Sequence, residues 1–194
     1  MPEKLPRRRL TDPRELRALA HPLRLRLMEE LAFGGPLTAS ELAERVGESP
    51  ANCSWHLRQL AKYGFVEEAE GRAGRRRPWR LVLQSSTWGD ADDRELQAAG
   101  QAVGEMLVEH EYAERRAFLA REAGEPRRWR DAAFLTQSLA WMTPAELHEV
   151  DTVLTEIVTR HPERFTDPST RPRGARPVRV LGWGFPARAA EEQG

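Results

Sequence analysis

Two short helical segments joined by a tight turn are the feature that most constrains the fold of this chain. A helix is expected to begin at Thr38, with Glu41 as its capping-box partner, and to end at Gly47. Only two residues later, Ser49 caps and Pro50 starts another helix. This spacing predicts a helix-turn-helix.

Two further helices are expected to precede this pair. Asp12 and Pro13 begin the first, which His21 and Pro22 interrupt, because a residue before proline is pushed away from helical dihedrals. Pro22 begins the next helix, which ends at residues 34–36 (GGP). The apolar side chains expected in the core of the four helices are Leu16, Leu19, Ala20, Leu23, Leu27, Leu31, Leu42, Ala43, Val46, Cys53, Leu57 and Leu60.

A β-hairpin with an arginine-rich turn is expected after the fourth helix. Residues 65–70 and 78–83 have the pattern of two strands, and residues 71–77 contain two glycines that permit a tight turn. Arginine is too costly to bury here, so its side chains project into solvent or onto phosphate. The four arginines that form this candidate DNA-contacting wing are Arg72, Arg75, Arg76 and Arg77.

The charge of the chain is divided unequally between its two halves. Residues 1–85 hold 16 Lys or Arg against 11 Asp or Glu, a net charge of +5. Residues 86–194 hold 14 against 19, a net charge of −5, so the overall charge is zero. A basic N-terminal half beside an acidic C-terminal half is expected when one half binds nucleic acid.

The outer face of the fourth helix, residues 50–63, is the candidate reading surface. Its mixed polar side chains match the donors and acceptors that contact base edges. Trp55 must stack on sugar or backbone, contact a thymine methyl, or fold back on the scaffold. His56 lies at the edge of the apolar stripe, where a structural histidine is the alternative to a phosphate contact. The candidate DNA contacts are Ala51, Asn52, Ser54, Trp55, His56, Arg58 and Gln59.

Four spaced motifs occur in order within residues 11–85. They are residues 19–24 (LAHPLR), 42–43 (LA), 54–60 (SWHLRQL) and 64–66 (GFV). Together they resemble the ArsR-like winged-helix repressors of bacteria. The resemblance implies a homodimer that binds an inverted-repeat operator and is usually released by an effector. The third helix carries no cysteine pair, so the resemblance is to a type that does not sense metals.

The N-terminal ten residues form a basic arm with two interpretations. Residues 1–10 are either a solubilising tail or a segment that reaches phosphate or the minor groove. They are not a signal peptide, and no apolar run of about 20 residues could span a bilayer. The single cysteine, Cys53, is expected to be buried, and a lone thiol fits a reducing cytoplasm. We therefore expect a cytoplasmic protein.

The second half is predicted to be a linker over residues 85–91 and a mostly helical domain over residues 92–194. Residues 92–122 form a long helix in which Gly100 and Gly104 permit close approach. This helix is the first candidate for a dimer seam, and an intramolecular helix contact is the alternative.

Three more elements are expected after the long helix. Residues 129–141 are a helix or a mixed segment, and Thr143 caps a helix that begins at Pro144. Residues 178–185 alternate as a strand, which pairs within the subunit, extends the wing or reaches a partner subunit. Five aromatic residues either line a pocket for an apolar or aromatic small-molecule effector or belong to the core: Trp129, Phe134, Trp141, Trp183 and Phe185.

Catalytic and metal-binding functions have little support. His110 with Glu114, and His148 with Asp151, each form at most half of a metal site, so no metal is expected. No nucleophile motif or phosphate-binding glycine loop is present, so neither an enzyme nor a cofactor is expected.

The sequence thus predicts a mainly α winged helix-turn-helix with a small β-hairpin wing over residues 11–84, followed by a mostly helical C-terminal domain. The expected function is a dimeric DNA-binding transcriptional regulator, a repressor on palindromic operators in double-stranded DNA, with release by a small organic effector as one option. The alternative is a winged-helix protein-interaction module without sequence-specific DNA binding.

Overall fold

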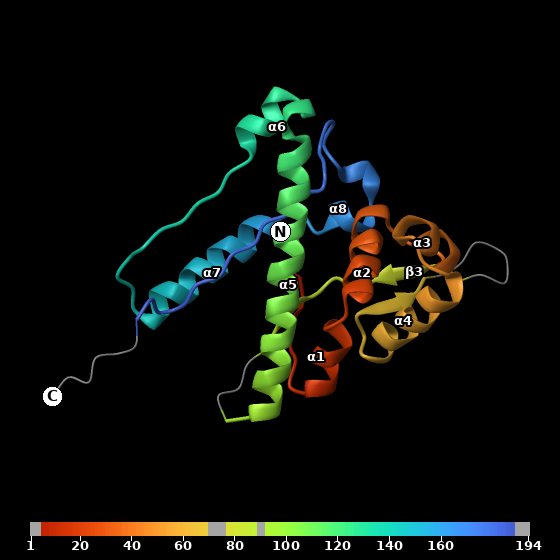
Figure 1. The fold of residues 1–194 in the computed structure, drawn as a ribbon, viewed down its shortest axis with the longest axis horizontal. Helices are drawn as coiled ribbons and strands as arrows, with labels where there is room; N and C mark the ends of the chain where they lie inside the picture. Colours follow the sequence, from red (N-terminus) through yellow and green to blue (C-terminus); the bar gives the residue numbers. More distant parts are fainter. Residues whose placement is uncertain (1–4, 70–76, 89–91, 189–194) are drawn as a thin grey trace.

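The computed structural model describes residues 5–69, 77–88 and 92–188 of the 194-residue chain. The four predicted N-terminal helices are confirmed, and side-chain caps fix where they begin. Asp12 accepts the amide N–H of Arg14, and Thr38 and Glu41 form the predicted capping box. The four helices are α1 (Pro13–Leu19), α2 (Pro22–Gly34), α3 (Ala39–Val46) and α4 (Pro50–Lys62) (Figure 1).

The turn between α3 and α4 depends on a glycine. Gly47 has a φ of +70°, in the left-handed region that side chains disfavour, and its N–H donates to the carbonyl of Ala43. Ser49 then accepts the N–H of Asn52 at the start of α4. The turn packs α3 against α4, as the sequence predicted.

The wing contains one more chain segment than expected. Strands β2 (Val66–Glu68) and β3 (Trp79–Leu81) pair antiparallel with Val66 opposite Leu81, and both are shorter than predicted. Leu37, just before α3, forms an antiparallel bridge with Trp79 through hydrogen bonds of 3.0 and 2.8 Å. This bridge ties the base of the wing to the helix-turn-helix.

The predicted free arm and linker are both wrong over the residues described. Strand β1 (Arg7–Arg9) pairs in parallel with β4 (Ser85–Thr87), and Leu10 is fully buried. These two polar segments have no alternating apolar pattern from which strands could be predicted. Their backbone N–H and C=O groups nevertheless form hydrogen bonds with one another, although 78 residues separate them in the chain. Residues 7–10 are therefore part of the folded domain.

A single hydrophobic core joins the N-terminal domain to the start of the next helix, α5 (Arg94–Arg121). This helix packs against α1 and confirms the predicted long helix. No helix within the described ranges is long and apolar enough to cross a membrane. The largest fully buried side chains of the core are Leu10, Leu16, Leu27, Leu42, Leu57, Leu60, Val66, Val103 and Cys53.

The two glycines of α5 have different surroundings. A Cβ on Gly100 would lie 2.6 Å from Cδ1 of Trp88, so this glycine admits an aromatic ring of the same chain. A Cβ on Gly104 would meet nothing within 4 Å. The close approach at Gly100 is thus intramolecular, although its partner is a side chain and not another helix.

The residues after α5 form an extension with little regular structure, residues 122–188. It contains α6 (Arg127–Ala132), α7 (Pro144–Val158) and α8 (Glu163–Thr166), with short 3₁₀ turns at Glu122–Gly124 and Pro168–Thr170. The predicted cap of α7 by Thr143 is confirmed. Residues 133–142, which we call the strap, are extended. Of the two predictions for residues 129–141, a helix or a mixed segment, the structure therefore has the mixed segment, with its helix ending at Ala132.

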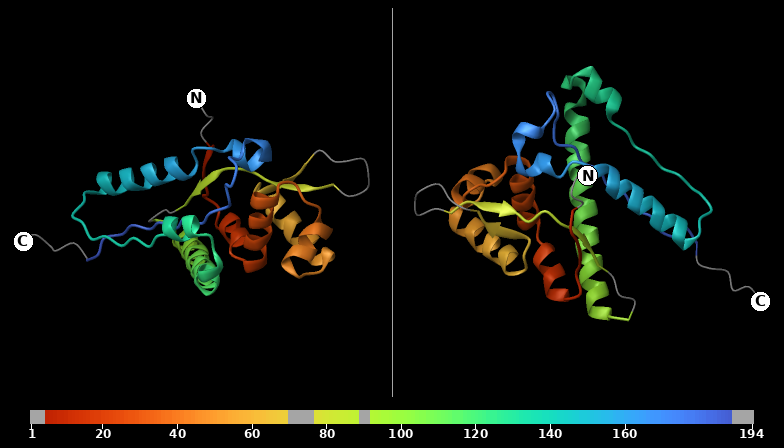
Figure 2. Two further views of the ribbon diagram at one scale, coloured as in Figure 1. Left: turned by 90° about the horizontal axis from the view of Figure 1, so that it is seen from above. Right: turned by 180° about the vertical axis from the view of Figure 1, so that it is seen from behind.

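The strand predicted at residues 178–185 is wrong within the described part of the chain. These residues are extended but join no sheet, because the neighbour that they meet is a helix. Gly182 and Gly184 approach α7 so closely that a Cβ on either would lie 2.5 or 2.6 Å from Leu154 or Leu147. The segment runs alongside α7, and both project to the side of α5 away from α4 (Figures 1 and 2).

Substituting each glycine of α5 by alanine should give opposite results. Gly104→Ala should raise the free energy of unfolding by about 0.5–1 kcal/mol, because alanine is the better helix former and its methyl has room. Gly100→Ala gains the same propensity but displaces Trp88, so it should lower stability by about 1–2 kcal/mol. Urea unfolding at one protein concentration measures both. Equal effects would show that Trp88 does not pack on Gly100.

Candidate nucleic-acid interface

The outer face of α4 presents most of the predicted reading residues at the surface. Trp55 is 50% exposed, and Ala51 and Arg58 are also exposed. Three more are half-buried: Asn52, Ser54 and Gln59. α4 lies at the edge of the domain, on the far side of α2 from α5 (Figure 1). The surface therefore stands clear of the C-terminal extension.

Hydrogen bonds one helical turn apart order the polar side chains of this face. Nδ2 of Asn52 donates to Oε2 of Glu48 at 3.0 Å, and Nη1 of Arg58 donates to Oγ of Ser54 at 2.9 Å. Exposed bonds of this kind contribute only about 0.5–1.5 kcal/mol net, so they can be exchanged for contacts to a ligand. The two bonds orient the side chains of Asn52 and Arg58. Arg58 keeps its positive charge uncompensated in this pair, because its partner Ser54 is neutral.

His56 lies on the other side of α4, and its placement corrects its inclusion among DNA contacts. Only 5% of the residue is exposed. Its ring centroid is 4.4 Å from that of His21 and 4.7 Å from that of Trp55, which it meets edge-on. His56 is therefore a scaffold residue that joins α4 to the start of α2. Trp55 also touches the scaffold through this ring, which leaves half of its surface free.

Burial and nearby positive charge favour the neutral form of the two histidine rings. Burial lowers the pKa of His56, and the charges of His21 and Arg24 lower it further. Burial also lowers the pKa of His21, again with help from Arg24. The Nδ1 atom of His21 accepts the N–H of Leu23 as the cap of α2, a role that requires an unprotonated nitrogen.

The basic wing is only partly described. Arg77 is exposed and pairs with Glu68 at 3.0 Å, and Arg80 pairs with Glu67 at 2.8 Å. Exposed pairs contribute about 0–1 kcal/mol, so either arginine can turn to a phosphate instead. Three wing arginines lie outside the described residues: Arg72, Arg75 and Arg76.

Arg8 is a structural residue that the sequence did not identify. Its Nη1 donates to the carbonyl of Tyr63 at 2.7 Å, at the end of α4. Its guanidinium also pairs with Glu15 and lies 5.3 Å from the ring centroid of Phe65. Arg8 thus clamps the end of α4 to the N-terminal strand. No local pattern signals this contact, because Tyr63 offers only its backbone carbonyl.

Cys53 is fully buried, as the sequence predicted. Burial raises the pKa of its thiol, and the charge of Glu48 adds to this effect. A buried, protonated thiol is a packing residue, so Cys53 supports the core beneath the reading face.

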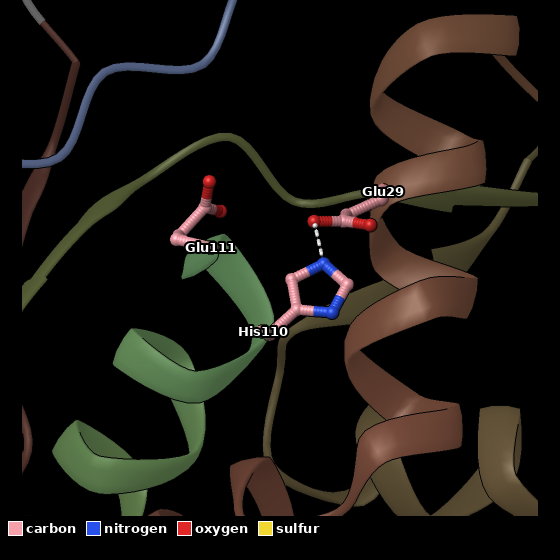
Figure 3. Close-up of side chains that lie close together, drawn as sticks. All are labelled: Glu29, His110 and Glu111. Atoms are coloured by element: carbon pink, nitrogen blue, oxygen red, sulfur yellow. Dashed lines mark hydrogen bonds and ion pairs between the residues drawn. The ribbon is translucent and has the colours of Figure 1, made fainter. Parts of the chain in front are cut away.

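A second cluster of charged groups links α2, α5 and the C-terminal extension. Glu29 from α2 and His110 and Glu111 from α5 gather at one point (Figure 3), and their donor atoms lie within 4.8 Å of one another. The Nε2 atom of His110 lies 2.9 Å from Oε1 of Glu29. Sequence analysis noted His110 but missed Glu29, because 81 residues separate the two.

An arginine supplies the positive charge of this cluster. Nη1 of Arg179 lies 2.6 Å from Oε1 of Glu29 and 3.0 Å from Oε1 of Glu111. The hydrogen bond to Glu29 contributes most to raising the pKa of Arg179. Burial acts to raise the pKa of Glu29, but Arg179 and His110 outweigh it and the pKa is lowered. A metal ion would have to displace Arg179, so we interpret the cluster as a structural ion network.

The predicted aromatic effector pocket does not form in the chain as described. Trp129 is half-buried, with the guanidinium of Arg176 at 5.4 Å from its ring centroid. The other four rings are 65–103% exposed, so they form neither a pocket nor a core: Phe134, Trp141, Trp183 and Phe185. A shallow apolar cavity of about 100 Å³ lies elsewhere, between Leu31, Leu81 and Phe165. Ligand sites usually measure about 300 Å³ or more.

Comparison with known proteins bears on the N-terminal half. Residues 19–69, from the end of α1 through the first wing strand, match the family model of a helix-turn-helix domain. None of the curated proteins matches the chain. The match and the observed β2–β3 hairpin together show a winged helix-turn-helix in the N-terminal half of the chain.

Three solved structures with some likeness to the chain each cover between 49% and 57% of it. One is the homodimeric winged helix-turn-helix DNA-binding domain of a possible ArsR-family transcriptional regulator from Mycobacterium bovis, 23% identical over 50% of this chain and 76% of that chain, with a TM-score of 0.34. Another is an ArsR-like transcriptional regulator from Rhodococcus sp. RHA1, 24% identical over 57% and 93% of the two chains, with a TM-score of 0.31. A third is the transcriptional repressor BigR from Xylella fastidiosa, 23% identical over 49% and 82%, with a TM-score of 0.31.

Acidification should destabilise the protein through the His21–His56 pair. Both pKa values are lowered in the folded state, so the unfolded chain binds more protons below about pH 6.5. The free energy of unfolding should therefore fall between about pH 7.5 and about pH 5.5. Urea unfolding of His56→Gln should show a smaller slope with pH. The exposed control His148→Gln should keep the slope, and identical slopes in all three proteins would contradict this role of the pair.

Removing Arg179 should weaken the attachment of the C-terminal extension. Arg179→Ala should lower stability by about 1–3 kcal/mol, because two carboxylates lose a charged hydrogen-bond donor. In a double-mutant cycle with Glu29→Gln, the coupling energy should be about 1 kcal/mol. Arg173→Ala, which removes an exposed arginine of the same segment, is the matched control. A coupling energy near zero would show that the ion network does not hold the extension.

Proposed function

We propose that this protein is a DNA-binding transcriptional regulator of the ArsR-like type, and that it acts as a homodimeric repressor. The observation that carries the proposal is the mainly polar outer face of α4, which lies at the surface of a helix-turn-helix domain that also carries the β2–β3 hairpin. The net charge of +5 on residues 1–85 favours association with a polyanion. We further propose that the chain is cytoplasmic and has no catalytic activity.

On this proposal α4 enters the major groove and the wing follows the adjacent backbone. Two-fold symmetry of the protein calls for an inverted-repeat operator with half-sites about 34 Å apart. The residues proposed to contact bases or sugar are Ala51, Asn52, Ser54, Trp55, Arg58 and Gln59. Those proposed to contact phosphate are Arg72, Arg75, Arg76 and Arg77.

The test is binding to the DNA just upstream of the protein's own gene. Fluorescence anisotropy at two salt concentrations, with random DNA as competitor, separates specific from non-specific binding. Tight binding that resists the competitor supports a self-regulating repressor. Failure of a wider selection from random DNA to enrich any motif would overturn the proposal.

Two arginines on neighbouring elements should respond differently in the same assay. Arg58→Ala on α4 should cost about 1–3 kcal/mol on the preferred sequence and little on random DNA, because a base contact is lost. Arg77→Ala on the wing should weaken binding to both and reduce the salt slope by about one. An equal loss on both DNAs for Arg58→Ala would make it a backbone contact.

One observation favours a second candidate function. The described wing arginines, Arg77 and Arg80, are already paired with Glu68 and Glu67, which reduces the positive charge that they present. A winged-helix protein-interaction module would tolerate this pairing. Such a module should elute from a heparin column at low salt, whereas a DNA-binding domain should be retained.

An effector is a separate part of the proposal. Its class would be a small apolar or aromatic compound, and binding would have to enclose it, because the rings of the extension form no pocket in the described chain. A thermal-shift screen of such compounds tests this on the whole protein.

A further inference from the structure

One large apolar side chain occupies the middle of the mainly polar outer face of α4. Trp55 is 50% exposed, whereas the other residues of this face that are proposed to contact DNA are small or polar. With about 100° of rotation per residue, Trp55 lies about 160° around the helix axis from both Cys53 and Leu57. Those two side chains are fully buried, so Trp55 stands on the side of α4 opposite the core.

Polar side chains flank Trp55 on both sides. Asn52 and Arg58 are three residues before and three residues after it, which places them about 60° to either side around the helix axis. Nδ2 of Asn52 is held by a hydrogen bond of 3.0 Å to Glu48. Nη1 of Arg58 is held by a hydrogen bond of 2.9 Å to Ser54. Trp55 is thus the centre of an ordered face whose flanks are polar.

The indole of Trp55 rests against a buried partner. Its ring centroid lies 4.7 Å from that of His56, with an interplanar angle of 88°. His56 is only 5% exposed, and its ring centroid lies 4.4 Å from that of His21 at the start of α2. A side chain that is already supported in the free protein loses less conformational freedom on binding. The contact with His56 therefore prepares the exposed half of the indole for a ligand.

The place of Trp55 on α4 determines which part of DNA it would meet. α4 lies at the edge of the domain, so its outer side is open to a ligand (Figure 1). The major groove is about 12 Å wide and admits one α-helix, whose side opposite its own domain faces the base edges. Side chains on the two flanks lie closer to the sugar–phosphate walls. For Trp55, this geometry favours a base contact over a contact with sugar or backbone.

The chemistry of an indole narrows the base edge that it recognises. Its surface is mostly carbon, with one N–H donor and no acceptor. Carbon placed against the donors and acceptors of a base edge would leave them without partners, which costs free energy. In the major groove, the apolar feature of the four base pairs is the C5-methyl group of thymine. Ala51, exposed and one helical turn before Trp55, adds a second apolar group on the same side.

We propose that Trp55 is a specificity residue that contacts the C5-methyl group of a thymine at one fixed position of the recognised sequence. The ring recognises the methyl group, while Asn52 and Arg58 contact base edges or backbone to either side. This inference rests on the proposed DNA-binding function and names what the centre of the reading face recognises. A cytosine methylated at C5 carries the same group, so the test includes that base.

Replacing single thymines by uracil tests the proposal without changing the protein. The probe is the duplex selected from random DNA, with each dT replaced by dU in turn, so that one methyl group is removed at a time. At one position the replacement should weaken binding about 3- to 10-fold, the loss expected for one buried methyl group. At that position, a 5-methyl-dC·dG pair should bind more tightly than an unmethylated dC·dG pair. Fluorescence anisotropy of the full chain measures each affinity.

Two alanine variants assign the methyl contact to a residue. Trp55→Ala should bind the dT and dU duplexes equally, because the ring that contacts the methyl group has been removed. Gln59→Ala is the matched control, since it also removes a neutral side chain from the same face. It should keep the uracil penalty of the wild type, whatever affinity it has. The uracil series uses the wild-type protein, so a folding defect in a variant does not affect that result.

Three results would overturn the proposal and leave the proposed function intact. They are a selected sequence in which no uracil replacement changes the affinity, a uracil penalty as large in Trp55→Ala as in the wild type, and equal binding of the methylated and unmethylated dC·dG pairs. Failure of the selection to enrich any sequence would instead overturn the proposed function, and this inference with it.

Discussion

The burial of one leucine-rich core is the constraint on which the rest of the structure depends. Strand β1 leads into it through Leu10, α1 to α4 converge on it, and α5 contributes Leu96 and Val103. Each buried leucine stabilises the fold by about 1.5–3 kcal/mol. Because Leu57 and Leu60 point into this core, the opposite side of α4 must face solvent. The reading face is therefore a consequence of packing, and no separate interaction is needed to expose it.

Polar side chains attach α4 to neighbouring elements, in addition to the packing of its apolar side in the core. The contact between the tilted rings of His21 and His56 joins α4 to the start of α2, and Arg8 binds the C-terminal end of α4 through the carbonyl of Tyr63. α4 is thus held at its middle and at its C-terminal end by residues that belong to earlier parts of the chain. Such support fixes the angle at which a helix of this kind would present its side chains to a groove.

The C-terminal extension is attached mainly by charge. Arg179 reaches Glu29 on α2 and Glu111 on α5, while the apolar side chains of the extension stay exposed. The ion network therefore connects an uncovered apolar surface to the helix that supports the helix-turn-helix. Arg179 is therefore a direct charged contact between residues 176–186 of the extension and α2.

The sequence by itself determined the local structure of the first half: the caps at Asp12, Thr38 and Ser49, the turn at Gly47 and the apolar face of α4 all follow from short-range rules. The same rules identified α5 and the start of α7. Tertiary structure alone decided the β1–β4 pairing, the burial of His56, the Trp88–Gly100 contact and the Arg179 network, because their partners are 12 to 150 residues apart and carry no periodic signal. The strand predicted at 178–185 was wrong because alternation predicts an extended chain but does not supply the neighbour that makes it a sheet.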